Sequence, residues 1–125
     1  MPDMTLQDII ARFQTHLNLD KIPLTLVAES DDLPVGTASL VYEDMSSRPD
    51  LSPWLASVYV IPEYRNRGIG SQLVRTIEEI SQKLCVSRLY LFTPDRIKFY
   101  VRLGWVVTEK TNYRNQRVVI MSKSF

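Results

Sequence analysis

The chain has 125 residues and a mass of 14.5 kDa, which is the size of one small domain. Hydrophobic residues make up 45% of it, enough to build a core without disulfides or metal. The 15 basic and 14 acidic side chains leave a net charge of +1, which argues against general electrostatic binding of nucleic acid or membranes. A single cysteine, Cys85, excludes an internal disulfide, and a single histidine, His16, argues against a zinc site.

The first eight residues contain acids and no apolar run, so they do not resemble a secretory signal. No stretch approaches the ~18 consecutive apolar residues of a membrane span. We therefore expect a soluble, cytoplasmic protein with a single domain over residues 1–125.

The N-terminal part of the chain predicts a helix followed by a hairpin. Over residues 5–17 the apolar side chains recur at helical spacing, and Thr5 with Asp8 resembles a capping box. Two strands joined by a turn are predicted next, over residues 24–29 and 35–43.

The middle of the chain predicts a strand–helix–strand unit after a loop over residues 45–53. The strand over residues 54–61 is apolar enough for a central, buried position. After a turn, a helix is predicted over residues 69–84 and a strand over residues 88–93. Such a crossover is right-handed and makes the two strands parallel.

The C-terminal part predicts a short helix over residues 94–103, ended by a left-handed glycine, Gly104. Two strands over residues 105–109 and 117–122 follow, around a polar loop at residues 110–116. The order of elements predicts an α+β or mixed α/β sheet.

Seven residues between the central strand and the long helix have the composition of an anion site: Arg65, Asn66, Arg67, Gly68, Ile69, Gly70 and Ser71. The first turn of a helix has backbone N–H groups without intrahelical partners, and the helix dipole adds partial positive charge. The glycines let a pyrophosphate approach the main chain, while the arginines and the serine add donors. For a G-x-G pattern alone, an ordinary helix start with solvated arginines is the competing interpretation.

Two common nucleotide motifs are absent. The dinucleotide pattern G-x-G-x-x-G lacks its third glycine, because Leu73 stands at that position and Val74 follows it, and no G-K-[ST] of a P-loop occurs. What remains is R/Q-x-x-G-x-G/A, present as Arg65-x-x-Gly68-x-Gly70.

With this signature the chain resembles the GNAT superfamily of acyl-CoA-dependent N-acetyltransferases. Three further segments fit in the same order: residues 56–64 look like the family's central strand and its exit, residues 89–93 like the strand that splays away from it, and residues 99–105 like its F-Y-x-x-L-G-[FWY] segment. The resemblance runs from about residue 24 to the C-terminus. It implies a three-layer α+β (mixed α/β) fold: a mostly antiparallel sheet with one splayed parallel pair and helices on both faces.

The resemblance also implies a mechanism with acetyl-CoA as co-substrate and no metal. In the family the central strand carries a bulge, and main-chain groups of Val58, Tyr59 and Val60 would hold the pantetheine arm. The N–H of Val58 would polarise the thioester carbonyl while an amine attacks directly. Tyr100 matches the tyrosine that protonates the departing thiolate; a phenol with a pKa of about 10 is protonated at pH 7. The competing interpretation of Tyr100 is a core aromatic residue.

The sequence does not identify the general base. Glu43 and Asp44 end the strand before the central one and are equally consistent with solvent-exposed charges, and a water chain is a further candidate. Cys85 is expected to be a buried structural thiol, because no histidine is available to activate it. His16 is expected to be structural or solvated.

The acceptor site is expected around Trp54 and the loops at residues 45–53 and 110–116, which shape it in this family. Most members also begin with a strand and a helix that precede the helix predicted at residues 5–17. Without them a sheet edge would be exposed, so we expect a second subunit of a homodimer, or a rearranged N-terminus, to cover it.

The sequence therefore predicts an N-acetyltransferase that acts on a primary amine of a small molecule, a peptide or a protein N-terminus. The alternative is a non-catalytic acyl-CoA-binding or sensing module. No nucleic acid or membrane partner is expected, because the charge is balanced and no aromatic stacking platform is apparent.

Overall fold

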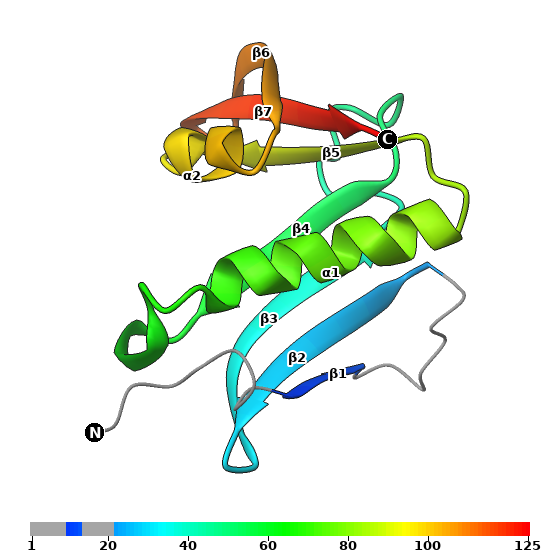
Figure 1. Cartoon of the computed structure of the whole chain (residues 1–125). Helices are drawn as coiled ribbons and strands as arrows, with labels where there is room; N and C mark the ends of the chain where they lie inside the picture. Colours follow the sequence, from blue (N-terminus) through cyan, green and yellow to red (C-terminus); the bar gives the residue numbers. More distant parts are fainter. Residues whose placement is uncertain (1–9, 14–21) are drawn as a thin grey trace.

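A computed structural model of the protein describes residues 10–13 and 22–125, with side chains over 22–125. Within these residues, one seven-stranded sheet forms the centre, accompanied by two α-helices and a short 3-10 helix (Figure 1). The strands are β1 (Ile10–Phe13), β2 (Leu24–Ser30), β3 (Leu33–Val41), β4 (Trp54–Val60), β5 (Arg88–Thr93), β6 (Val106–Tyr113) and β7 (Gln116–Ser124). The helices are η2 (Pro62–Tyr64), α1 (Ile69–Lys83) and α2 (Ile97–Arg102).

The sheet is mixed and mostly antiparallel, as the sequence predicts. Its strand order is β1-β2-β3-β4-β5-β7-β6, and the neighbours β4 and β5 form its parallel pair. The chain passes from β4 to β5 through α1, which lies across β4 and β3 in Figure 1. The strand–helix–strand unit thus joins two antiparallel parts of one sheet.

Strand β4 carries a bulge in its middle. Between two rungs of the β3–β4 ladder, Thr37↔Tyr59 and Ser39↔Ala56, β4 uses one more residue than β3 does. Ser57 lies in this step with a left-handed φ of 55°, and its carbonyl oxygen accepts a hydrogen bond of 2.8 Å from Thr37 Oγ1. A bulge of this kind bends the strand and re-aims the residues that follow it.

The parallel pair separates almost at once. Its register contains one rung, Trp54↔Tyr90, supported by a 3.1 Å hydrogen bond from the Tyr90 N–H to the Pro53 carbonyl oxygen. Residues 56–60 of β4 therefore have no ladder partner in β5. The implied splay of the two strands is confirmed.

Two groups of buried side chains fill the two faces of the sheet. Both α1 and α2 contribute to the larger one, whose members include Leu26, Leu40, Leu73, Ile77, Leu89 and Trp105. The smaller one contains Met45, Trp54, Val118 and Ile120 and is covered by the segment between β3 and β4. Helices were expected on both faces, but α1 and α2 both pack on the larger group.

The prediction of a helix over residues 5–17 is wrong at its centre. Residues 10–13 form β1, which pairs antiparallel with β2 from Ile10↔Glu29 to Phe13↔Leu26. Helical spacing of apolar residues describes only the local chain, whereas the free edge of β2 offers a row of hydrogen-bonding groups. A rearranged N-terminal segment thus lies on this edge, while His16 lies outside the described residues.

Two further expectations are corrected. Residues 110–116 are not a loop, because β6 continues to Tyr113 and a two-residue turn leads into β7. Cys85 is exposed rather than buried, since it follows the α1 C-cap Leu84 with a left-handed φ of 64°. The expected left-handed Gly104 after α2 is confirmed, with φ 97°.

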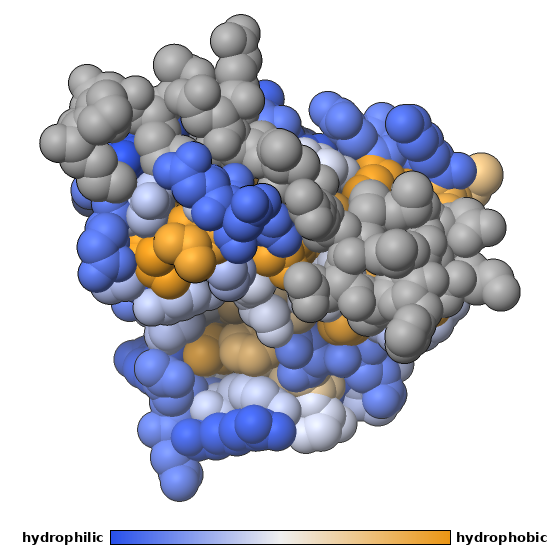
Figure 2. All heavy atoms as spheres, turned by 90° about the horizontal axis from the view of Figure 1, so that it is seen from below, coloured by the Kyte–Doolittle hydropathy of each residue, from blue (hydrophilic) through white to orange (hydrophobic). Residues whose placement is uncertain are grey.

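The surface seen in Figure 2 mixes hydrophilic side chains with several separate apolar areas. No helix among residues 10–13 and 22–125 is both long and apolar enough to cross a membrane. Over the same part of the chain, no cluster of three or more His, Cys, Asp or Glu side chains could hold a metal ion.

Candidate active site

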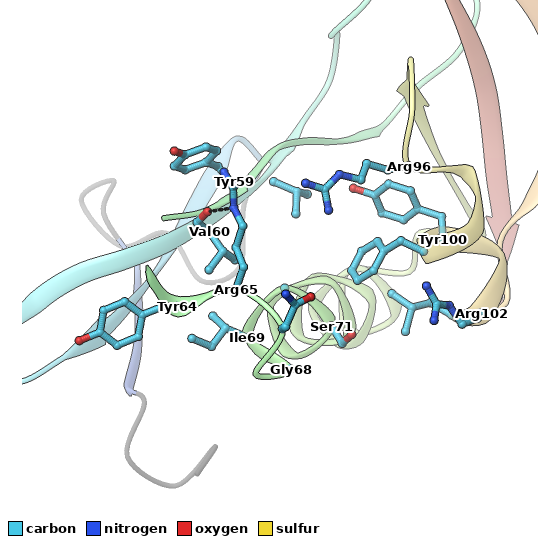
Figure 3. A pocket seen from close by; sticks show the side chains of 15 residues that line it. Tyr59, Val60, Tyr64, Arg65, Gly68, Ile69, Ser71, Arg96, Tyr100 and Arg102 are labelled. Carbon is cyan, nitrogen blue, oxygen red and sulfur yellow. Dashed lines mark hydrogen bonds between the residues drawn. The ribbon is translucent and has the colours of Figure 1, made fainter. Parts of the chain in front are cut away.

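A pocket of about 560 Å³ opens where β4 and β5 diverge (Figure 3). Its walls come from the second half of β4, the turn and first residues of α1, and α2. The lining residues are Val58, Tyr59, Val60, Tyr64, Arg65, Asn66, Gly68, Ile69, Gly70, Ser71, Arg96, Phe99, Tyr100, Arg102 and Leu103. All residues predicted for the site line this pocket except Arg67.

The N-terminus of α1 presents free backbone donors to the pocket. Gly68 is its N-cap residue with φ 84°, a conformation that suits glycine, and no side chain caps the helix. The first backbone bond of the helix runs from the Gln72 N–H to the Gly68 carbonyl oxygen (3.0 Å). The N–H groups of the three residues between them have no intrahelical acceptor, and the first turn contains no acid. This end of the pocket is therefore built for an anion.

The two arginines of the predicted anion site have different surroundings. Arg65 lies in the pocket wall, where its Nε donates to the Val60 carbonyl oxygen (2.8 Å) and its guanidinium sits 5.3 Å from the centre of the Tyr59 ring. Arg67 stacks on Tyr64 instead, 5.1 Å from the ring centre, and does not line the pocket. One nitrogen of Arg67, Nη1, is buried with no hydrogen-bond partner in the structure. Arg65 thus lines the pocket, whereas Arg67 does not.

Tyr100 stands at the opposite end of the pocket, on α2. It is 7% exposed and packs edge-to-face against Phe99 and Trp105, with ring centres 4.9 and 6.0 Å away. Burial raises the pKa of Tyr100 to about 12, against the opposing effect of the Arg96 charge. Its hydroxyl points into the pocket in Figure 3, so Tyr100 is both a core aromatic residue and a pocket residue.

A buried polar network holds α2 in place. Glu78 of α1 accepts a 2.8 Å hydrogen bond from Lys123 Nζ and a 3.1 Å bond from Trp105 Nε1. Lys123 also donates to the Leu103 carbonyl oxygen at the end of α2 (2.7 Å). The network therefore links α1 and β7 to the helix that carries Tyr100.

Sequence reasoning missed two charged pocket residues: Arg96, which precedes the F-Y-x-x-L-G-[FWY] segment, and Arg102, which stands at one of its unspecified positions. Their signal is spacing: Arg96 precedes Tyr100 by four residues, so both belong to one face of α2. In addition, no carboxylate among residues 22–125 lines the pocket. The pocket is accordingly cationic.

The residues expected around the acceptor lie outside this pocket. Trp54 is fully buried, with its Nε1 donating to the Leu51 carbonyl oxygen (2.7 Å). Glu43 is exposed and Asp44 half-buried, and burial raises the pKa of Asp44 above its ordinary value against the effect of the Arg114 charge. Neither carboxylate lines the pocket.

The segment between β3 and β4 is tied to strand β6. A salt bridge of 2.6 Å joins Arg48 Nη1 to Glu109, and the Ser46 N–H donates to the Tyr113 hydroxyl (3.2 Å). These contacts fix this segment against the β6–β7 hairpin.

Comparisons with known proteins agree with this geometry. The family model described as "Acetyltransferase (GNAT) domain" matches residues 22–107, more than half of the chain. An amino-acid acetyltransferase from Aeromonas salmonicida (strain A449) is 31% identical over 98 residues, which make up 76% of this chain. The match spans only 20% of that curated relative.

Solved structures share the fold. A structure of Arabidopsis thaliana Naa50 in complex with the bisubstrate analogue CoA-Ac-MVNAL is 27% identical, with a TM-score of 0.65 over 81% of this chain and 72% of that one. A GNAT family acetyltransferase from Elizabethkingia anophelis with acetyl-CoA bound is 13% identical, with a TM-score of 0.72 over 94% of this chain and 99% of that one. The protein described by this sequence, sheet and pocket belongs to the GNAT family of acetyltransferases.

Proposed function

We propose that the protein transfers an acetyl group from acetyl-CoA to a primary amine of a small molecule or peptide. The observation that carries the proposal is the divergence of β4 and β5 after one rung, over a pocket that joins free helix amides at one end to Tyr100 at the other. A long, narrow donor with an anionic part and a reactive end matches this shape.

The residues present fit the anionic part of acetyl-CoA. The first-turn amides of α1, the hydroxyl of Ser71 and the guanidinium of Arg65 together offer donors to a pyrophosphate. Asn66 and Ile69 complete this wall, and Arg67 supports it through Tyr64 rather than by facing the pocket. The lack of carboxylates in the lining favours an anionic ligand further.

Strand β4 would hold the pantetheine arm. The side of β4 that faces β5 has no ladder partner beyond Trp54, so we assign the amides of the arm to main-chain groups of Val58, Tyr59 and Val60. Tyr59 also pairs with Thr37 of β3, and the Val60 carbonyl oxygen already accepts a hydrogen bond from Arg65 Nε (2.8 Å). The bulge at Ser57 re-aims these residues. We assign to the N–H of Val58 the hydrogen bond that polarises the thioester carbonyl and stabilises the oxyanion as the amine attacks.

Tyr100 would act as the general acid for the departing sulfur. Its pKa, raised to about 12, keeps the hydroxyl protonated throughout the physiological range. Neither Glu43 nor Asp44 lines the pocket, so we assign removal of the amine's proton to water. The similarity to an amino-acid acetyltransferase and to a protein bound to a peptide-containing analogue supports an amino acid or peptide amine as acceptor.

The test is release of free CoA thiol from acetyl-CoA across a panel of amino acids, peptides and polyamines. We expect turnover with at least one amine, and a loss of about 10²-fold or more in kcat for Tyr100→Phe with little change in the KM for acetyl-CoA. Tyr42→Phe is the matched control, because Tyr42 is 58% exposed and lies outside the pocket. Tight binding of acetyl-CoA without turnover on any amine would instead support the acyl-CoA-binding module.

A further inference from the structure

Arg96 occupies a defined position at the start of α2. Its backbone N–H donates to Thr93 Oγ1 (3.0 Å), and its carbonyl oxygen accepts the first bond of the helix, from the Tyr100 N–H (3.3 Å). These two bonds hold Arg96 at the N-terminus of α2, one helical turn before Tyr100. Both side chains therefore face the same pocket from the same element (Figure 3).

The side chain of Arg96 differs in its hydrogen bonding from those of the other two arginines of the pocket. Arg65 donates to the Val60 carbonyl oxygen (2.8 Å), and Arg102 donates to the Lys98 carbonyl oxygen (3.4 Å). The Arg96 side chain forms no hydrogen bond or ion pair with the residues that the structure describes, although it is close enough to Tyr100 for its charge to act on the hydroxyl. A free guanidinium beside a buried hydroxyl is a site for a developing negative charge.

The chemistry of a thioester supplies that charge at this end of the pocket. A thiol has an ordinary pKa of about 8.5, well below the value of about 12 that burial gives Tyr100. Transfer of a proton from such a phenol to a thiolate is therefore uphill. The sulfur must therefore carry its negative charge when the carbon–sulfur bond breaks. A neighbouring cation lowers the barrier to this cleavage, because it stabilises the leaving thiolate before the sulfur is protonated.

We propose that Arg96 is a catalytic residue whose guanidinium binds the sulfur of the donor and stabilises its negative charge beside Tyr100. The inference rests on the proposed acetyl transfer. In that step the amine nitrogen forms a bond to the acetyl carbon and the carbon–sulfur bond breaks, leaving its electron pair on sulfur. Sulfur then takes the Tyr100 proton, Tyr100 regains one from solvent, and the amine's proton leaves to water.

Titration of the thiol of bound CoA tests the inference without any turnover. The thiolate is followed by ultraviolet difference absorbance against the desulfo-CoA complex of the same variant, which subtracts the tyrosines. We expect a depressed thiol pKa in the wild-type complex and a rise of about one pH unit, a tenfold change, in Arg96→Gln. Arg96→Lys should retain most of the depression because it keeps the charge.

A matched variant distinguishes the effect of Arg96 on the thiol pKa from that of a change in net charge. The remaining titratable side chains of the pocket come from β4, η2, the turn before α1 and α2: Tyr59, Tyr64, Arg65, Tyr100 and Arg102. Arg75→Gln removes one positive charge from an exposed position of α1 outside the pocket and should leave the thiol pKa unchanged. Because Arg96 is itself exposed, its substitution should not unfold the protein.

The outcomes separate the inference from the proposed function. Absence of CoA binding to the wild-type protein would contradict the proposed function. Binding with the same thiol pKa in wild type and Arg96→Gln would overturn the role of Arg96 and leave acetyl transfer standing. In turnover, Arg96→Gln should lower kcat at least tenfold with a KM for acetyl-CoA within about threefold of wild type, and Arg96→Lys should restore most of it.

Discussion

The carboxylate of Glu78 is the centre of a buried polar network that reaches the side chain of Tyr100. It lies 6% exposed on α1 and accepts hydrogen bonds from both Lys123 and Trp105. Trp105 in turn packs against Tyr100. One carboxylate thus sets the position of a residue on a different helix.

We predict that Glu78→Gln lowers the free energy of unfolding by about 2 kcal/mol. The substitution leaves the Lys123 ammonium without its counter-charge, but that side chain is 24% exposed, so the loss stays below that of a fully buried pair. Urea unfolding measures the difference, and Glu79→Gln, at the exposed neighbouring position of α1, is the control. Equal destabilisation by both variants would contradict the network.

The burial of Asp44 predicts that the free energy of unfolding depends on pH. Burial raises its folded pKa above the ordinary value of 3.8, so the folded state holds its proton more tightly than the unfolded chain does. Its stabilising contribution is therefore complete below pH 3.8 and is lost as the pH rises through the folded pKa. Asp44→Asn should be more stable than wild type at pH 7 and equal to it at pH 3.5, which unfolding in urea at the two pH values checks.

The sequence predicts much of the pocket at this scale, because its phosphate turn and its tyrosine lie in short, ordered motifs. Arg65, Gly68 and Tyr100 all reach the pocket. Arg67 does not, since stacking on Tyr64 turns its side chain away, and no sequence pattern encodes that choice. Arg96 belongs to no motif and is brought to the site only by the position of α2.

Among the elements, the two hairpins share one turn geometry. Asp31 and Asp32 link β2 to β3, and Arg114 and Asn115 link β6 to β7, all four with φ between 51° and 65°. Positive φ at both positions of a two-residue loop is the type I′ turn, which matches the right-handed twist of the strands and favours glycine at its second position.

We predict that Asp32→Gly and Asn115→Gly each raise the free energy of unfolding by about 0.5–1 kcal/mol, because glycine adopts this conformation without strain. Asp32→Ala should lower it by about 1 kcal/mol, since alanine lacks the local hydrogen bonding that lets aspartate adopt a positive φ. Chemical denaturation of the three variants checks the signs. A stabilising Asp32→Ala would contradict the assigned turn.

The errors of sequence prediction at the scale of elements have one cause. Residues 110–113 are polar and look like a loop, yet they extend β6, which lies at the sheet edge and is exposed along most of its length. Residues 10–13 have helical spacing, yet they form β1 on the edge of β2. In both places pairing with a neighbouring strand overrides the local pattern, whereas α1, with its long apolar face, is predicted almost to the residue.

At the scale of the molecule, the sheet consists of two antiparallel parts, β1–β4 and β5–β7, joined by one parallel rung. We predict that CoA at about 100 times its dissociation constant raises the melting temperature by about 10 °C, since such an excess stabilises the fold by about 2.7 kcal/mol. Differential scanning fluorimetry measures the rise. Pantetheine, which lacks the pyrophosphate, should give a much smaller rise at the same concentration, and equal effects would contradict binding at α1.

The homodimer stays a prediction. It was expected because one sheet edge would be bare, and β1 now lies on that edge over four residues. The overall fold could be predicted because several different motifs of the family occur in the same order along this chain. Its quaternary arrangement depends on surfaces that no motif describes.

The single rung between β4 and β5 has a consequence for the life of the protein in a cell. Under the proposed function the acyl-CoA donor fills the gap between β4 and β5, so a plentiful donor should make the sheet harder to open, and proteases act on the opened form. The cellular amount of the protein should then follow the supply of activated acyl groups. When the donor is scarce, more of the protein should be degraded.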